Sequence, residues 1–89
     1  MALQPDEKKK IIEKFKLHKK DTGSPEVQIA LLTERIKKVV GHLKEHPHDK
    51  HSRRGLIGLI GQRRRLLHYL MARDEDRYRN LLKALNLRK

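Results

Sequence analysis

Apolar residues recur at the period of an α-helix along most of the chain, and no stretch alternates for long enough to predict a strand. An apolar stripe at positions 11, 12 and 15 follows Pro5, Asp6 and Glu7, which suit the first turn of a helix. Ser24 is a good N-cap for a second helix beginning at Pro25. The apolar side of that helix consists of Ile29, Leu32, Ile36, Val39 and Leu43. The spacing predicts a short first helix and a long second one that ends between positions 41 and 47.

A polar connection over residues 46–51 leads to a third helical segment with one broad apolar face. That face consists of Leu56, Leu59, Ile60, Leu66, Leu67 and Leu70. Three consecutive acids at 74–76 suit the start of a fourth helix. Its apolar side consists of Tyr78, Leu81, Leu82 and Leu85. The sequence therefore predicts an all-α fold of four helices in one domain spanning residues 1–89.

Three glycines interrupt the first half of the third helix, at positions 55, 58 and 61. Each glycine costs about 1 kcal/mol relative to alanine in an exposed helix. One explanation is the close approach of another helix or of a phosphate backbone. The other is a sequence drift that tertiary packing of the helix tolerates.

The composition narrows the function. The chain has 89 residues, 23 lysines and arginines against 11 acids, and a net charge of +12. Such a charge favours a polyanionic partner, and so short a chain cannot build a large catalytic α/β domain. The absence of cysteine excludes disulfides, thiolate nucleophiles and cysteine zinc sites. Because no apolar run has the length of a signal peptide core or a membrane span, we expect a cytoplasmic protein without a membrane partner.

The basic residues are unevenly distributed, since nine of the ten arginines lie after residue 50. Arginine suits bidentate phosphate contacts better than lysine does. The third helix carries Arg53, Arg54, Arg63, Arg64 and Arg65. Some of these must face away from the apolar stripe, which predicts a basic ridge with salt-sensitive binding to nucleic acid. The alternative is a solvated charged face without a partner.

The few aromatic residues indicate which nucleic acid is bound. Phe15 and Tyr78 fall at core positions, which leaves Tyr69 as the one available ring. Proteins that bind single strands usually offer several stacking rings. We therefore expect recognition of folded shape, phosphates and sugar hydroxyls, in structured RNA or duplex DNA.

Six histidines raise the question of a metal site. His42 and His46 are four residues apart and Asp49 follows, but Pro47 interrupts the geometry and no HExxH pattern is present. Together with Ser52, these side chains can instead hydrogen-bond base edges and 2′-hydroxyls in a shallow RNA minor groove. We expect no metal and no cofactor.

No pattern indicates catalysis. The sequence has neither a nucleophile beside a base nor a glycine-rich phosphate loop. Ser24 and Ser52 are both explained as helix caps, so we expect a binding protein and not an enzyme.

Three segments carry a resemblance to a known family: DTGSPEVQ at residues 21–28, HSRRGL at 51–56 and QRRRLL at 62–67. In these segments the chain closely resembles bacterial small-subunit ribosomal protein number fifteen, and the similarity extends from about Phe15 to Arg88. The resemblance implies three helices in an antiparallel bundle and an N-terminal helix able to swing away. It implies binding to the central domain of 16S ribosomal RNA at a three-way junction, as a monomer when free.

The resemblance also implies further partners. These are neighbouring small-subunit proteins, large-subunit ribosomal RNA at the subunit interface, and the protein's own messenger RNA, whose translation several members repress.

The resemblance places RNA contacts at two patches. The junction patch consists of Thr22, Gly23, Gln28, Arg65 and Tyr69. The second patch, which would contact a G·U/G·C motif in a minor groove, consists of His42, His46, Asp49 and Ser52. Charge adds four candidate phosphate contacts, Arg35, Arg53, Arg64 and Arg73.

The residues alone leave two alternative functions open. A helical DNA-binding protein would place a recognition helix in the major groove, which the polar side chains around Asp49 suit less well than an RNA minor groove. A basic protein docking on acidic proteins or membranes would discriminate little between RNA shapes and would expose bulky apolar residues.

Overall fold

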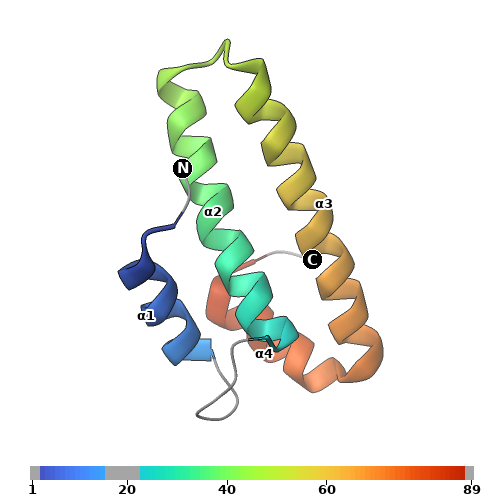
Figure 1. The fold of residues 1–89 in the computed structure, drawn as a ribbon. Helices are drawn as coiled ribbons and strands as arrows, with labels where there is room; N and C mark the ends of the chain where they lie inside the picture. The colour runs from blue at the N-terminus through green and yellow to red at the C-terminus, as the bar shows by residue number, and fades with distance from the viewer. Residues whose placement is uncertain (1–2, 16–22, 88–89) are drawn as a thin grey trace.

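The computed structural model describes residues 3–15 and 23–87, and this part of the chain forms four helices and no strand. They are α1 (Pro5–Phe15), α2 (Pro25–Glu45), α3 (Lys50–Arg73) and α4 (Glu75–Leu85). The two long helices, α2 and α3, run antiparallel, with α4 packed against their lower ends and α1 beside α2 (Figure 1). The all-α prediction and the four helices are confirmed.

The core lies where α2, α3 and α4 meet. Its central cluster joins Ile29 of α2, Leu70 of α3, and Tyr78 and Leu81 of α4. Partly buried side chains surround this cluster, namely Phe15, Leu66, Leu67, Leu82 and Leu85. The upper halves of α2 and α3 have fewer buried residues, so the bundle is anchored mainly at one end.

Polar side chains fix the helix starts. Ser24 Oγ accepts from the backbone N–H of Val27 at 3.3 Å, as predicted for the N-cap of α2. Asp74 caps α4 in the same way, accepting from the backbone N–H of Arg77 at 3.1 Å. The prediction of Ser52 as a cap is wrong, because Asp49 is the N-cap of α3 and accepts from the Ser52 N–H at 3.0 Å.

The first helix lies against α2. Lys38 Nζ donates to Glu7 Oε1 at 2.6 Å, and Leu3, just before α1, is buried. Phe15 packs on the core cluster at the other end of α1. These contacts hold α1 on the bundle in this conformation, and its ability to swing away stays a prediction.

The glycines of α3 do not mark a helix contact. A methyl group built at Gly55, Gly58 or Gly61 would meet no atom within 4 Å. The close approach of another helix is therefore wrong for the described residues, which leaves approach of a phosphate backbone or tolerated drift. None of the helices described is long and apolar enough to span a membrane.

Candidate nucleic-acid interface

A groove of about 540 Å³ runs between the lower halves of α2 and α3. Its floor is apolar and is formed by Leu31, Leu32 and Leu66. Its polar rim consists of Gln28, Arg35, Gln62, Arg65 and Tyr69. Four of these five rim residues are candidates from the sequence, and the fold brings them to one site although α2 and α3 are separate segments.

Gln28 is held in place at one end of this groove. Its side-chain Nε2 donates to the carbonyl oxygen of Gly23 at 2.6 Å. This bond uses the amide nitrogen and leaves Oε1 as an acceptor for a ligand. Gly23 and Gln28 are thus linked within the protein, whereas Thr22, the other candidate of this connection, lies outside the described residues.

Tyr69 is the exposed ring of the groove, with 49% of the residue accessible. The Arg73 guanidinium lies over the ring, with its Cζ 5.4 Å from the ring centroid. By contrast, Tyr78 is buried in the core and Phe15 is packed against it. The sequence-based assignment of Tyr69 as the one available ring is confirmed for the three aromatic residues.

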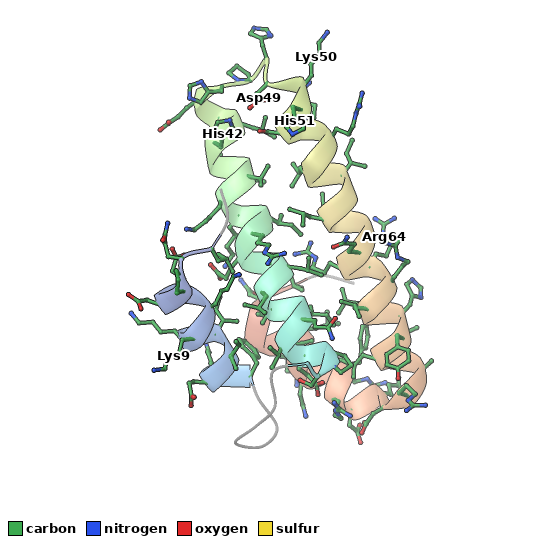
Figure 2. All side chains as sticks on the ribbon, viewed as in Figure 1. Lys9, His42, Asp49, Lys50, His51 and Arg64 are labelled. Atoms are coloured by element: carbon green, nitrogen blue, oxygen red, sulfur yellow. The ribbon has the colours of Figure 1, made fainter. Side chains whose placement is uncertain are left out.

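A second polar cluster lies at the opposite end of the helix pair, where the connection joins α2 to α3 (Figure 2). His42 Nε2 lies 2.8 Å from Asp49 Oδ2, and the Ser52 hydroxyl donates to the same oxygen at 2.7 Å. The rings of His42 and His46 are 4.8 Å apart at their centroids. The structure therefore brings the four residues of the second predicted patch together; we call them the corner cluster.

The hydrogen bonds of the corner cluster determine its charge. The backbone N–H of Ser52, then its hydroxyl and then His42, hold the pKa of Asp49 well below its usual range. Because the ionised carboxylate only accepts, His42 Nε2 carries the hydrogen of their shared bond, and Nδ1 of a neutral ring is an acceptor. Ser52 is only 5% exposed, so its hydrogen bonds to Asp49 serve to orient that carboxylate.

The adjacent arginines of α3 do not form one ridge. Arg65 faces the groove, whereas Arg64 lines the opposite flank of α3 and lies on the side of the helix away from α2 (Figure 2). Arg63 is half-buried and its Nη1 donates to Thr33 Oγ1 at 3.3 Å, while burial lowers the pKa of its guanidinium. Arg54 is exposed.

Arg53 belongs to the corner of the bundle. Its Nη2 donates to the Pro47 carbonyl at 2.6 Å, which ties the start of α3 to the preceding connection. Its charge remains exposed, so it can serve both the local structure and a phosphate. Of the predicted site residues that the structure describes, Arg64 alone lies with neither the groove nor the corner cluster.

Sequence reasoning missed two residues that shape the site. Gln62 lines the groove, and its positions three before Arg65 and seven before Tyr69 would have placed it on the same helix face. Glu26 is buried and pairs with Arg77, 51 positions away, for which the sequence carries no local signal. Among the described residues no group of three potential ligands could hold a metal ion.

Comparisons with known proteins identify the family of the chain. A family model described as Ribosomal protein S15 matches residues 8–88. Small ribosomal subunit protein uS15 of Chloroflexus aurantiacus is 57% identical over 89 residues, the whole of both chains. The proteins of the same name from Roseiflexus castenholzii and Desulforamulus reducens are 60% and 62% identical, again over both whole chains. A family model that matches most of the chain and relatives of this identity show that the chain belongs to the ribosomal protein S15 family.

Proposed function

We propose that the protein, a structural constituent of the small ribosomal subunit in the cytoplasm, binds the central domain of 16S ribosomal RNA and stabilises one geometry of a three-way junction. The family is one of ribosomal structural proteins and not of enzymes. The observation that carries the proposal is the placement of two polar clusters on one pair of antiparallel helices. At 1.5 Å per residue, Gln28 and His42 are about 20 Å apart along α2.

The groove offers the chemistry that a junction requires. Arg35 and Arg65 on its rim suit phosphates of converging strands. Tyr69 presents a ring on which an unstacked base can lie, and Gln28 Oε1 can accept from a base or a 2′-hydroxyl. Gly23 allows the backbone of the first connection to approach RNA closely, and a methyl group there would meet no protein atom within 4 Å. We infer that Thr22 adds a polar contact beside it.

The corner cluster offers acceptors, which suits a G·U/G·C minor groove. The only base donor in the minor groove is the amino group of guanine, and each RNA sugar adds a 2′-hydroxyl. Asp49 carries a negative charge among +12 of net charge, so it favours these donors over phosphates. The rings of His42 and His46 add further hydrogen-bond acceptors beside Asp49. Arg53, which is held by the Pro47 carbonyl, contacts a phosphate of the adjoining RNA backbone.

The spacing of the two sites explains how binding selects a junction geometry. Both sites lie on α2 and α3, which pack against each other as an antiparallel pair. An RNA in which two helical arms meet at the wrong angle can engage only one site and gains less binding free energy. Binding therefore shifts the RNA population toward the arrangement that engages both sites.

The same surface accounts for the other partners that we propose. A messenger RNA that presents a similar pair of features would compete for it, which gives a route to self-repression. An ordered junction would favour attachment of neighbouring small-subunit proteins, and exposed basic side chains outside the two sites suit large-subunit RNA at the interface. We propose that the free protein is a monomeric single domain.

The test is the affinity for a three-way-junction fragment of 16S ribosomal RNA and for a plain RNA duplex of equal length, measured across a salt series. We expect junction binding to be far tighter and to persist at high salt. Equal affinities that fall together as salt rises would contradict the proposal and favour a basic protein without shape selection. Equal affinity for duplex DNA would favour the DNA-binding alternative.

Two variants test whether the groove determines the affinity for the junction fragment. Arg65→Gln should weaken junction binding and reduce the dependence on salt by about one counterion. Arg79→Gln is the matched control, because Arg79 is an exposed arginine of α4 outside both sites that pairs with exposed Glu75. Equal losses for the two variants would show that total charge and not the groove determines affinity.

A further inference from the structure

A second hollow, of about 270 Å³, lies between α3 and α4. Its polar residues are Arg63, Arg64 and His68, and its apolar walls include Leu67, Met71 and Tyr78. At 100° per residue, positions 60, 64 and 67 lie on the opposite side of α3 from positions 62, 65 and 69 of the groove. This hollow is therefore separate from the two sites of the proposed function.

Arg63 supplies a positive charge without a carboxylate partner among the described residues. Its guanidinium donates to the neutral Thr33 hydroxyl, and burial lowers the pKa of Arg63. No buried side-chain nitrogen in the described part of the chain lacks a hydrogen-bond partner, so its remaining N–H groups reach solvent. Since Arg63 lines the hollow, an anion there would compensate a charge that the fold leaves partly desolvated.

The other two polar residues are accessible. Arg64 and His68 are exposed on adjacent turns of α3, and the whole helix contains no aspartate or glutamate. Of the three acids that follow it, Asp74 caps α4 and Glu75 pairs with Arg79, which leaves Asp76 as the one exposed acid there with no ion pair among the described residues. The electrostatic potential at the hollow therefore favours an anion with several acceptor oxygens, such as a phosphate.

The apolar walls determine what else the ligand carries. Met71 is 40% exposed although it is a large apolar residue, and Leu67 beside it is only partly buried. A flat heterocycle would cover this surface, and methionine adapts well to aromatic groups. The volume of about 270 Å³ is close to the lower end of the range of about 300–1,000 Å³ typical of small-molecule sites. The hollow is therefore large enough for one nucleotide but too small for a longer segment.

We propose that the hollow between α3 and α4 binds a single nucleotide. Its phosphate lies on Arg63, Arg64 and His68, and its base lies against Leu67 and Met71. The nucleotide can be an unpaired residue of an RNA strand or a free mononucleotide, because both present the same phosphate and base.

The test is a titration of the ¹⁵N-labelled full-length protein, followed by NMR, with four probes. The probes are adenosine 5′-monophosphate, inorganic phosphate, adenosine and a single-stranded hexa-adenylate RNA. We expect adenosine 5′-monophosphate to shift the amide signals of residues 63–71 and the side-chain Nε–H signals of Arg63 and Arg64. Adenosine and phosphate alone should each bind more weakly. Tighter binding of the hexa-adenylate at the same signals identifies an RNA strand as the source, and equal binding identifies a free nucleotide.

Variants provide the control. Arg64→Gln and His68→Gln should each weaken binding of adenosine 5′-monophosphate roughly tenfold, as expected for loss of one charged hydrogen bond. Arg54→Gln removes an exposed arginine of α3 that does not line the hollow and should leave the affinity unchanged. Equal losses in all three variants, an absence of shifts at 63–71, or equal affinity for inorganic phosphate would overturn the proposal. Binding of the junction fragment is measured separately and does not depend on this result.

Discussion

Glu26 and Arg77 form a two-point ion pair that joins the first turn of α2 to the first turn of α4. Arg77 Nε donates to Glu26 Oε2 and Nη2 donates to Oε1, both at 2.5 Å. The glutamate is buried at 7% exposure, so its charge is compensated mainly within the protein. Glu26 lies in the sequence between Gly23, just before α2, and the groove residue Gln28, so this contact closes the bundle at the end where those two residues lie.

The ion pair should stabilise the fold. Arg77→Ala leaves a buried carboxylate without its two donors and should lower the free energy of unfolding by about 2 kcal/mol. The matched control is Arg79→Ala, on the same helix, whose partner Glu75 and own side chain are both exposed, so the loss should stay below about 0.5 kcal/mol. Urea denaturation followed by circular dichroism measures both. Equal losses would mean that the Glu26–Arg77 pair does not fasten α4 to α2.

Asp49 should make stability depend on pH. Its pKa is lowered in the folded protein, chiefly by the backbone N–H of Ser52 and then by the hydroxyl. A lowered folded-state pKa gives stabilisation that is complete above about pH 5 and is lost as the pH falls below the ordinary aspartate value of about 3.9. Asp49→Asn should therefore be less stable than the wild type at pH 7, and the difference should shrink in acid.

The carboxyl signal of Asp49 tests the cause. In a ¹³C NMR titration, Ser52→Ala should raise the pKa of Asp49 toward its ordinary range, because one donor is lost. The pKa should remain below that range, because the Ser52 backbone N–H is still present. Asp76→Asn, which changes an exposed acid of α4, serves as the control. An unchanged Asp49 titration in Ser52→Ala would contradict the hydrogen bond.

Tyr69 should contribute to junction binding by stacking and not by charge. Tyr69→Leu keeps an apolar side chain but removes the ring, and it should weaken binding of the junction fragment by about 1–3 kcal/mol. The slope of affinity against salt should not change, since no phosphate contact is lost. Tyr69→Phe keeps the ring and should retain most of the affinity, as filter binding can measure. A loss in Tyr69→Phe as large as in Tyr69→Leu would assign the effect to the hydroxyl.

Replacing Gly58 by alanine should not destabilise the fold. Gly58→Ala adds a methyl group that meets no protein atom within 4 Å and restricts the unfolded chain, so stability should rise by about 0.5–1 kcal/mol. Thermal unfolding measures this, and a decrease would show that the surroundings of α3 are closer than described. Weaker RNA binding by this variant but not by Gly41→Ala would favour approach of a phosphate backbone to α3.

The sequence predicts the fold well because its signals are local. Apolar spacing and the capping residues Ser24 and Asp74 identify the helices and their starts almost to the residue. The error at Ser52 arises because two polar side chains compete for one helix start. Which of the two side chains caps α3 depends on where the chain turns. The turn lies before Asp49, because the Asp49 N–H donates to the His46 carbonyl at 3.1 Å. That turn makes Asp49 the cap.

The candidate site is predicted less evenly. The three adjacent arginines of α3 look equivalent in the sequence, but each turns 100° from the next. Arg63 is therefore half-buried at the hollow, Arg64 is exposed at the hollow, and Arg65 lines the groove on the other side of the helix. The sequence does contain the signal for the partial burial of Arg63, because position 63 continues the helical spacing of the apolar residues Leu59, Leu66 and Leu70. The contact between Glu26 and Arg77 could not be found in this way, since it exists only after the chain has folded.

Asp74 ends α3 and begins α4: its backbone N–H donates to the Leu70 carbonyl at 2.8 Å and its carboxylate caps the next helix. The two helices therefore share one residue and have no spare linker. Inserting a single residue into the first turn of α4, with the Asp74 cap kept, would rotate Tyr78 and Leu81 by about 100° about the helix axis and carry them away from the core. Chain length is thus fixed at the junction of α3 and α4 as strictly as side-chain chemistry is elsewhere.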